Sequence, residues 1–303
     1  MYAGDRDPGG PAENVNLYTA SIVALDSDTG KLKWFYQEVP KDVWDFDAAY
    51  ECVLVDREVK GRMRKLLLQV SKAGYTFVLD RETGEFLNAF PIVDTSTWVK
   101  GITEDGKLVG RNEPVPGKVV NVCPSAMGAK QWNQVAYSPR TGLLYTPTIE
   151  MCANYTAVEQ EPVEGAAFGG GRWDFTPAKT APNLAHIDGY DAGTGKRAWS
   201  VPQRNIILAS MLATAGDLLF TGDPLGNYFA LNAGTGEKLW SFQTGAGHRG
   251  SSITYAVNGR QYIATPTGIG GAVANTLTSM LEDGPGFRGG STLVVFALPE
   301  DQK

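Results

Sequence analysis

The sequence has few of the side chains on which common metal and redox sites depend. Its 303 residues include three cysteines, Cys52, Cys123 and Cys152, and two histidines, His186 and His248. A haem-attachment motif needs C-x-x-C-H and a structural zinc site needs paired Cys or His ligands, so both kinds of site are excluded. A disulfide between two of the three cysteines would indicate an oxidising compartment.

Long hydrophobic runs and an excess of positive charge are also lacking. No stretch is apolar for long enough to cross a bilayer, and a formal net charge of −6 disfavours a nucleic-acid-binding surface. The polar start at Met1–Asp5 shows no signal peptide, which predicts a cytoplasmic protein or a chain that is less than a whole precursor. Glycine is abundant, with 36 residues beside 17 prolines. This composition suits many short strands joined by turns.

One strand-turn-strand pattern recurs along the chain. In its full form, Asp or Asn begins the turn, a glycine follows four residues later, and a tryptophan follows four residues after that in three of the copies. We expect the Asp or Asn side chain to bond to the turn backbone, the glycine to supply a positive φ, and the tryptophan to pack against the next unit. The turn glycines are 41 to 58 residues apart, at Gly30, Gly84, Gly142, Gly195 and Gly236. This period is typical of β-propeller blades, with hairpins of a β-sandwich as the alternative.

Further strands are predicted between these turns, and longer excursions interrupt them. Alternating apolar residues predict strands at 65–70, 75–79, 143–148, 217–221, 228–231, 253–257, 261–265 and 292–298. Excursions rich in Gly, Pro and polar residues occupy 89–122, 153–185 and 266–290. Gly169–Gly171 lies in one of them without a preceding strand or a following Gly-Lys-Ser/Thr, so a cover loop is expected rather than a phosphate-binding loop.

Two carboxylates stand close together in segment 40–48, which reads PKDVWDFDA. Asp45 and Asp47 are two residues apart, and such residues point to the same side of an extended segment. Converging carboxylates suit a hard, oxygen-seeking cation, although a solvated loop or a turn cap would use the same residues. Lys72 lies between two apolar strand runs, where both a surface lysine at a hairpin tip and a functional lysine are consistent with the sequence.

Several longer motifs carry a resemblance to a known family. Beside PKDVWDFDA they are LLLQVSKAGYTFVLDRETG (66–84), GDRDPGGPAENVNLYTASIVALD (4–26), NVCPSAMGAKQWNQVAYSPRTGLLY (121–145) and GDLLFTGDPLGNYFALNAGTGEKLWSFQTGAG (216–247). Together they resemble the quinoproteins that use pyrroloquinoline quinone (PQQ), the PQQ-dependent alcohol dehydrogenases of the methanol and ethanol dehydrogenase family. The resemblance implies an all-β fold in which residues 1–303 form a single β-propeller region. It corresponds to the C-terminal half of an eight-bladed propeller, with about four to five blades.

The resemblance also implies roles for individual residues. Asp45 matches the family's general base, which takes the hydroxyl proton of the alcohol while hydride moves to the quinone. Asp5, Asp45 and Asp47 are the implied metal positions for calcium or a lanthanide ion, although Asp5 stands where the family usually has an asparagine. Lys72 matches the basic residue that bonds the quinone oxygens. Gln131 stands where an asparagine usually contacts the cofactor.

The cysteines are interpreted in the same way. Cys123 and Cys152 flank the predicted hairpin at 131–148 and match the positions of a disulfide in the family. Cys52 would then remain as a small buried hydrophobic residue.

Two functions remain open at this stage. The first is an oxidoreductase of the periplasm that oxidises a primary alcohol with PQQ and a Ca²⁺ or lanthanide ion and passes electrons to cytochrome c. The second is a non-catalytic propeller scaffold, like propeller lipoproteins of outer-membrane assembly, or an inactive fragment. The family's ligand glutamate, vicinal disulfide and stacking tryptophan have no counterpart in residues 1–303. A complete site would therefore need the other propeller half or an oligomeric partner.

Overall fold

The described part of the chain folds into β-strands joined by turns and loops. The computed structural model describes residues 15–161, 163–166, 168–271 and 290–298, and these residues form strands and turns without a helix. Accordingly, this part of the chain contains no helix with the length and apolarity needed to span a membrane. Two compact units are present, Met1–Lys130 with Ile149–Pro182 and Gln131–Thr148 with Asn183–Lys303. Asp5 lies outside the described residues, so its implied role as a ligand stays a prediction.

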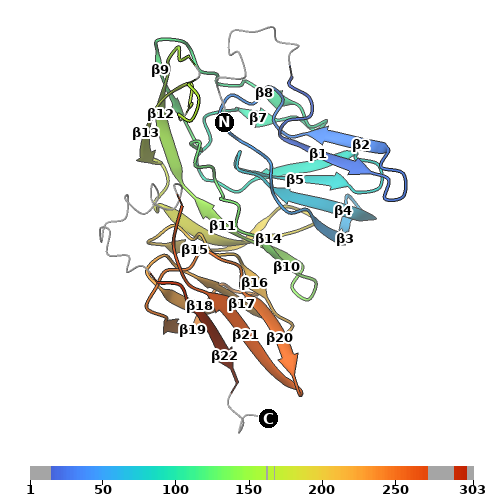
Figure 1. Cartoon of the computed structure of the whole chain (residues 1–303). Coiled ribbons are helices and arrows are strands. Elements are labelled where there is room, and N and C mark those ends of the chain that lie inside the picture. The colour runs from blue at the N-terminus through green and yellow to red at the C-terminus, as the bar shows by residue number, and fades with distance from the viewer. Residues whose placement is uncertain (1–14, 162, 167, 272–289, 299–303) are drawn as a thin grey trace. The chain divides into compact units, whose positions relative to one another are not determined.

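The first unit contains one four-stranded antiparallel sheet and three smaller sheets (Figure 1). The four-stranded sheet has the order β3-β4-β5-β6, and the others are β1-β2, β7-β8 and β13-β12-β9. The strands are β1 (Ser21–Leu25), β2 (Leu32–Gln37), β3 (Val53–Val59), β4 (Arg62–Val70), β5 (Tyr75–Asp80), β6 (Phe86–Pro91), β7 (Gly101–Ile102), β8 (Leu108–Val109), β9 (Val119–Val122), β12 (Met151–Ala157) and β13 (Gly171–Pro177).

The second unit contains two four-stranded sheets, β10-β11-β14-β15 and β16-β17-β18-β19, and the three-stranded sheet β20-β21-β22. Sheets in which consecutive antiparallel strands are neighbours are typical of propeller blades. The strands are β10 (Ala136–Ser138), β11 (Leu143–Ile149), β14 (Ala185–Asp191), β15 (Arg197–Gln203), β16 (Leu212–Ala213), β17 (Leu218–Gly222), β18 (Asn227–Asn232), β19 (Lys238–Gln243), β20 (Ile253–Val257), β21 (Arg260–Pro266) and β22 (Leu293–Ala297).

The recurring turn has the chemistry expected from the sequence. In the copy that joins β14 to β15, Asp191 Oδ1 accepts a hydrogen bond of 2.8 Å from the Thr194 backbone N–H, and Gly195 has a φ of 73°. A side chain that bonds to the backbone two or three residues later closes the turn without help from distant parts of the chain. The same backbone bonds are made by Asp26, Asp80 and Asn232.

The tryptophans pack on the glycines of neighbouring turns, as predicted. A Cβ on Gly84 would lie 2.7 Å from the ring of Trp34, and one on Gly236 would lie 2.7 Å from the ring of Trp199. Trp199 also donates a hydrogen bond of 3.1 Å from its indole nitrogen to the carbonyl oxygen of Ala233. These glycines are therefore required both for a positive φ and for the close approach of an aromatic ring.

Two of the predicted excursions contain more regular structure than the sequence indicated. The segments 89–122 and 153–185 supply β9, β13 and most of β12, which form a three-stranded sheet. Gly171 is the first residue of β13 rather than part of a cover loop. The strand signal is the alternation of Trp173 and Phe175 with polar residues, and the many glycines and polar residues around it obscured the pattern. Residues 272–289 of the third excursion lie outside the described residues.

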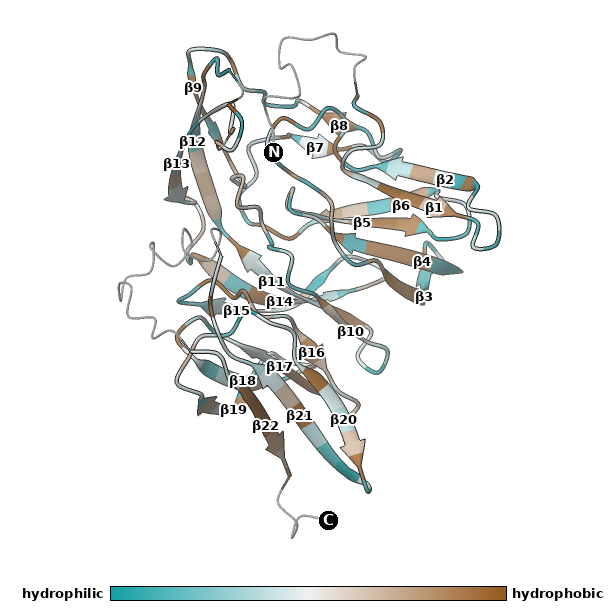
Figure 2. Cartoon of the chain, in the orientation of Figure 1, coloured by the Kyte–Doolittle hydropathy of each residue, from teal (hydrophilic) through white to brown (hydrophobic). Residues whose placement is uncertain are grey.

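Apolar side chains from the strands form a separate core in each unit. All six residues of β5 are buried, and aromatic side chains including Trp44, Phe46 and Trp98 pack in the core of the first unit. In the second unit the core includes Tyr145, Phe229 and residues of β14 and β17. Figure 2 shows the apolar residues concentrated along strands such as β4, β5 and β22. The candidate site residues Asp45 and Asp47 are the chain neighbours of Trp44 and Phe46 in this aromatic core.

Candidate functional site

The two predicted carboxylates lie on the segment that connects β2 to β3. Trp44 and Phe46 are 1% and 0% exposed, whereas the side chains of Asp45 and Asp47 are 32% and 35% exposed. The aromatic residues anchor the segment in the core and leave the alternate acidic residues facing away from it. The segment is not a β-strand, because Asp45 has a φ of 67°, yet the two carboxylates still converge as expected.

Asp42 shapes this segment and was not identified from the sequence. Its two carboxylate oxygens accept hydrogen bonds from the backbone N–H groups of Trp44, at 2.9 Å, and Phe46, at 2.8 Å. A buried carboxylate that accepts two backbone hydrogen bonds fixes the conformation of the turn. It takes the place of the backbone bonds that strand pairing would otherwise provide. The Asp residue two positions before Trp44 was the available signal, since Asp favours such local bonds.

Lys72 joins the two carboxylates. It lies between β4 and β5, is 3% exposed, and its Nζ is 3.0 Å from Asp45 Oδ2 and 2.9 Å from Asp47 Oδ1. Lys72 therefore lies at the tip of the β4–β5 hairpin, as one alternative held, but the alternative of a surface lysine is wrong because the side chain is buried. Removing an ammonium group from water is unfavourable unless it is paired, and the two aspartates provide that pairing.

Gly128 makes room for the stem of Lys72. A Cβ at position 128 would lie 2.1 Å from Lys72 Cγ, and Gly128 has a φ of 76°. The Lys72 carbonyl oxygen also accepts a hydrogen bond of 2.9 Å from the Ala129 backbone N–H. The loop that contains Gly128 thus holds the backbone and the side chain of Lys72 at once.

The charges in this cluster influence one another. Burial raises the pKa of Asp45 above its ordinary value, the Lys72 ammonium opposes that shift, and the nearby Asp47 carboxylate adds to it. Both carboxylates contact the Lys72 ammonium at about 3 Å, so this cation occupies the position that their two contacting oxygens share. Carboxylate oxygens are the type of ligand that calcium and lanthanide ions prefer, and Asp45 and Asp47 are the residues here that would offer them.

Glu38 is a second buried acid that was not identified from the sequence. It follows β2 directly and is 1% exposed, and neither of its carboxyl oxygens has a hydrogen-bond partner among the described residues. Burial raises its pKa to about 8, and the nearby Ser71 hydroxyl offsets this only partly. Its position after a strand with partly buried aromatic residues gave no sign that the carboxyl group would be enclosed.

Gln131, the predicted cofactor contact, belongs to the second unit. It is 6% exposed and lines a cavity of about 220 Å³ together with Trp132, Leu208, Arg249 and other residues of that unit. The structure thus brings Asp45, Asp47 and Lys72 together in the first unit and places Gln131 at a cavity of the second.

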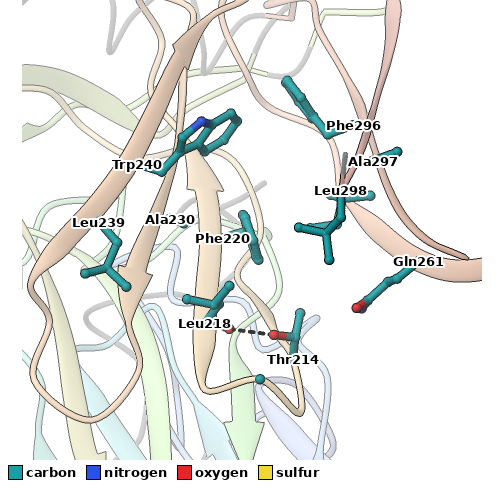
Figure 3. A pocket seen from close by; sticks show the side chains of 12 residues that line it. Thr214, Leu218, Phe220, Ala230, Leu239, Trp240, Gln261, Phe296, Ala297 and Leu298 are labelled. Atoms are coloured by element: carbon teal, nitrogen blue, oxygen red, sulfur yellow. Dashed lines mark hydrogen bonds between the residues drawn. The ribbon is translucent and has the colours of Figure 1, made fainter. Parts of the chain in front are cut away.

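A larger cavity of the second unit has a different character. It has a volume of about 480 Å³ and lies between the sheets β16–β19 and β20–β22, where Phe220, Trp240 and Phe296 line it (Figure 3). Thr214 donates its hydroxyl proton to the Leu218 carbonyl oxygen at 3.4 Å, and no titratable side chain is among the lining residues. Acid-base or metal chemistry has no support from this lining.

The cysteines pair as the resemblance implied, but Cys52 differs from the expectation. Cys123 and Cys152 form a disulfide, whereas Cys52 is exposed rather than buried. Cys52 precedes the edge strand β3, in which Val55 and Val59 are buried and Leu54 is 59% exposed. Because alternate residues share a face, Cys52 falls on the exposed face with Leu54.

Comparisons with known proteins agree with this architecture. The sequence profile of the PQQ family, described as glucose/ethanol/alcohol dehydrogenase, beta-propeller domain, matches residues 1–97 and 200–263, just over half of the chain. The quinoprotein ethanol dehydrogenase of Pseudomonas putida is 37% identical, and the match covers 98% of this chain and 49% of that protein. The lanthanide-dependent methanol dehydrogenase of Methylorubrum extorquens is 33% identical over 99% of this chain and 55% of its own.

The solved structures give the same result. A europium-containing methanol dehydrogenase superposes with a TM-score of 0.88 at 32% identity, covering 96% of this chain and 55% of that protein. The chain thus spans about half the length of the relatives it matches, and its sheets are blades of a partial β-propeller. From its repeated turns, its blade sheets and these matches, we conclude that the chain belongs to the PQQ-dependent alcohol dehydrogenase family of quinoproteins.

Proposed function

We propose that this chain supplies the general base, two metal-binding carboxylates and a quinone-binding lysine for the oxidation of a primary alcohol. The observation that carries the proposal is the position of Lys72, a buried lysine whose ammonium contacts both Asp45 and Asp47. A scaffold has no need of three converging charges beside its core, and burying them is costly for stability.

The chain's own residues have distinct tasks in this proposal. Lys72 holds Asp45 through its Oδ2 oxygen, so that Oδ1 is the oxygen that accepts the hydroxyl proton of the alcohol. Asp47 is held by the same ammonium, and together with Asp45 it offers carboxylate oxygens to a Ca²⁺ or lanthanide ion. When bound, the metal and PQQ would supply a Lewis acid and a hydride acceptor, respectively. Lys72 and Gln131 would contact the quinone.

The setting of the reaction is part of the same proposal. Residues 1–303 would form one propeller region in the bacterial periplasm, which is oxidising and consistent with the Cys123–Cys152 disulfide. A relative from Comamonas testosteroni, 36% identical over 91% of this chain, is a quinohemoprotein alcohol dehydrogenase. That name supports a haem protein such as cytochrome c as the electron acceptor.

The test combines cofactor binding with turnover by the protein that contains this chain. The parent should develop the absorbance of bound PQQ with Ca²⁺ or La³⁺ and should oxidise a primary alcohol with an artificial electron acceptor. Asp45→Asn should lower turnover at least about 100-fold and leave the fold unchanged, because it removes the base and keeps the shape. The control Asp56→Asn, at an exposed residue of β3, should retain activity. Parent-like turnover by Asp45→Asn would exclude Asp45 as the base.

A further inference from the structure

The segment that carries Asp45 and Asp47 has an unusual backbone. Lys41 and Asp45 have φ values of 48° and 67°, in a region that residues other than glycine rarely adopt. Such conformations are unfavourable and persist only where the surrounding structure holds them in place. The described residues 38–52 contain no β-strand, so strand pairing does not provide that support. Contacts with other parts of the first unit are therefore needed to fix this segment.

Arg111 bonds to the main chain near the start of the segment. Its Nη2 donates a hydrogen bond of 2.7 Å to the Lys41 carbonyl oxygen, and its Nη1 donates to the Pro40 carbonyl oxygen. Arg111 follows β8 in the excursion 89–122 and is 70 positions from Lys41 in the sequence. Because the donors of a guanidinium group have a fixed planar arrangement, two bonds to successive carbonyl groups restrain the orientation of both peptide groups.

Nearby acidic residues hold Arg111 in this position. Its Nε is 3.3 Å from Glu113 Oε1, and its side chain is 19% exposed. Burial lowers the pKa of Arg111, and the Glu113 and Asp42 carboxylates oppose that shift, so both acids attract the guanidinium group. Asp42 is the residue that accepts the backbone bonds of Trp44 and Phe46. Arg111 therefore acts on the segment through two carbonyl groups and through the carboxylate that fixes its turn.

The residue after Arg111 holds the same segment next to Asp45. The Trp44 indole nitrogen donates a hydrogen bond of 2.8 Å to the Asn112 carbonyl oxygen. The Asn112 backbone N–H in turn donates a hydrogen bond of 2.7 Å to the Trp98 carbonyl oxygen. Both tryptophans belong to the aromatic core of the first unit. Arg111 and Asn112 thus join the main chain before Asp45 to that core.

We propose that Arg111 is a positioning residue for the alcohol oxidation, because it fixes the segment from which the Asp45 and Asp47 carboxylates project. It acts through the main chain that precedes them, and the two carboxylates then remain in place on the Lys72 ammonium. Its importance for the oxidation rests on the proposed function. Its effect on the segment can be measured without a cofactor, a metal or turnover.

Hydrogen exchange in the full chain, without PQQ or metal, is the first test. The two reporter groups are the Trp44 indole N–H, which bonds to Asn112, and the Phe46 amide N–H, which bonds to Asp42. Arg111→Gln should accelerate the exchange of both groups at least about tenfold, since it loosens the segment locally. Amide groups of the buried strand β5 serve as the internal reference and should change less. Arg111→Lys keeps the charge but lacks the planar fork, so its exchange rates should fall between those of the parent and Arg111→Gln.

The matched control is Arg81→Gln. Arg81 also lies in the first unit, donates a hydrogen bond of 3.2 Å to the Val55 carbonyl oxygen, and pairs with Asp56 at 2.8 Å. Its side chain is 26% exposed, which is close to the value for Arg111. This variant loses similar bonds to β3 and should leave the two reporter groups at the parent's exchange rates. Equal exchange rates in the parent and Arg111→Gln would overturn the inference.

Turnover by the protein that contains this chain is the second test. A displaced base slows the reaction of bound substrate, so Arg111→Gln should lower kcat at least about tenfold and change KM for the alcohol less than kcat. Arg111→Lys should recover part of this loss, and Arg81→Gln should retain the parent's kcat. Faster exchange in the segment together with an unchanged kcat would overturn the positioning role. If the parent oxidises no alcohol, the proposed function is wrong, whereas the exchange rates still decide whether Arg111 fixes the segment.

Discussion

Gly128 leaves the space that the side chain of Lys72 occupies. A Cβ at position 128 would come within 2.1 Å of Lys72 Cγ, although the two residues are 56 positions apart. The lysine is 3% exposed, so its stem has little room to move aside. The pairing of Lys72 with Asp45 and Asp47 therefore depends on a residue that carries no functional group.

Gly128→Ala should destabilise the protein and displace Lys72 from the aspartates. Both the positive φ and the clash disfavour alanine, and together they should cost roughly 1–4 kcal/mol of unfolding free energy. The control is Gly117→Ala, because Gly117 has a φ of 71° with nothing within 4 Å of its added Cβ. Denaturant unfolding of both variants separates the clash from the backbone strain. Equal losses would show that the contact with Lys72 is unimportant.

Asp47 should determine the preference between metal ions. If its carboxylate is a ligand, the additional negative charge favours a trivalent ion over a divalent one. Asp47→Ala should then weaken lanthanide-dependent alcohol oxidation at least about tenfold more than calcium-dependent oxidation. The comparison is made in one protein with the two ions, so a general loss of folding affects both equally. Similar losses of activity with Ca²⁺ and La³⁺ would show that Asp47 does not determine the preference for a lanthanide ion.

The disulfide should contribute substantially to stability. Cys123 and Cys152 are 29 residues apart, and closing a loop of this length is worth roughly 3–4 kcal/mol in the chain-entropy model. Cys123→Ser with Cys152→Ser should lower the unfolding free energy by about this amount, whereas Cys52→Ser, at an exposed position, should have little effect. Thiol counting under denaturing, non-reducing conditions should find one free thiol, and three would exclude the disulfide.

Glu38 should make stability depend on pH. Its folded pKa of about 8 lies above the ordinary value of 4.5, because burial disfavours the charged form. The folded protein therefore binds more protons than the unfolded chain between these values, so the unfolding free energy should fall as pH rises from about 4.5 to 8. Glu38→Gln should flatten this dependence and stabilise the protein near pH 8, by an amount on the order of a few kcal/mol.

Denaturant unfolding between pH 5 and 9 checks this prediction. The control is Glu58→Gln, at an exposed residue of β3, which should retain the parent's dependence on pH. A Glu38→Gln variant with the parent's slope would show that Glu38 is not the group responsible.

Local sequence patterns predicted much of the fold because the forces behind them act over a few residues. Asp191 and Gly195 form a turn through a bond between near neighbours, and alternating apolar residues predicted β20 with its observed bounds. The same dependence on local pattern explains the error in the segment 153–185. There, many glycines and polar residues obscured the alternation that forms β13.

The candidate site could be predicted only in part. Asp45 and Asp47 were identified because two acidic residues alternate with aromatic ones, a pattern contained in four residues. From the sequence, Lys72 could be either a surface residue or a functional one. Its pairing with Asp45 and Asp47 requires the β4–β5 turn and the segment before β3 to meet, which the sequence does not show. Glu38 was missed because nothing in its immediate neighbours shows that its carboxyl group is enclosed. Asp42 was missed although its place two residues before Trp44 favours a local bond to the backbone.

By itself, the sequence determined the strand periodicity, the Asx-Gly-Trp turns and membership of the quinoprotein family, because each depends on residues close together in the chain. Only the tertiary structure decided that Lys72 is buried against two carboxylates, that Gly128 accommodates its stem, that Cys52 is exposed, and that Gln131 and Arg249 line one cavity. The physical reason is that burial and charge pairing are set by segments distant in sequence, whose approach depends on the packing of whole sheets.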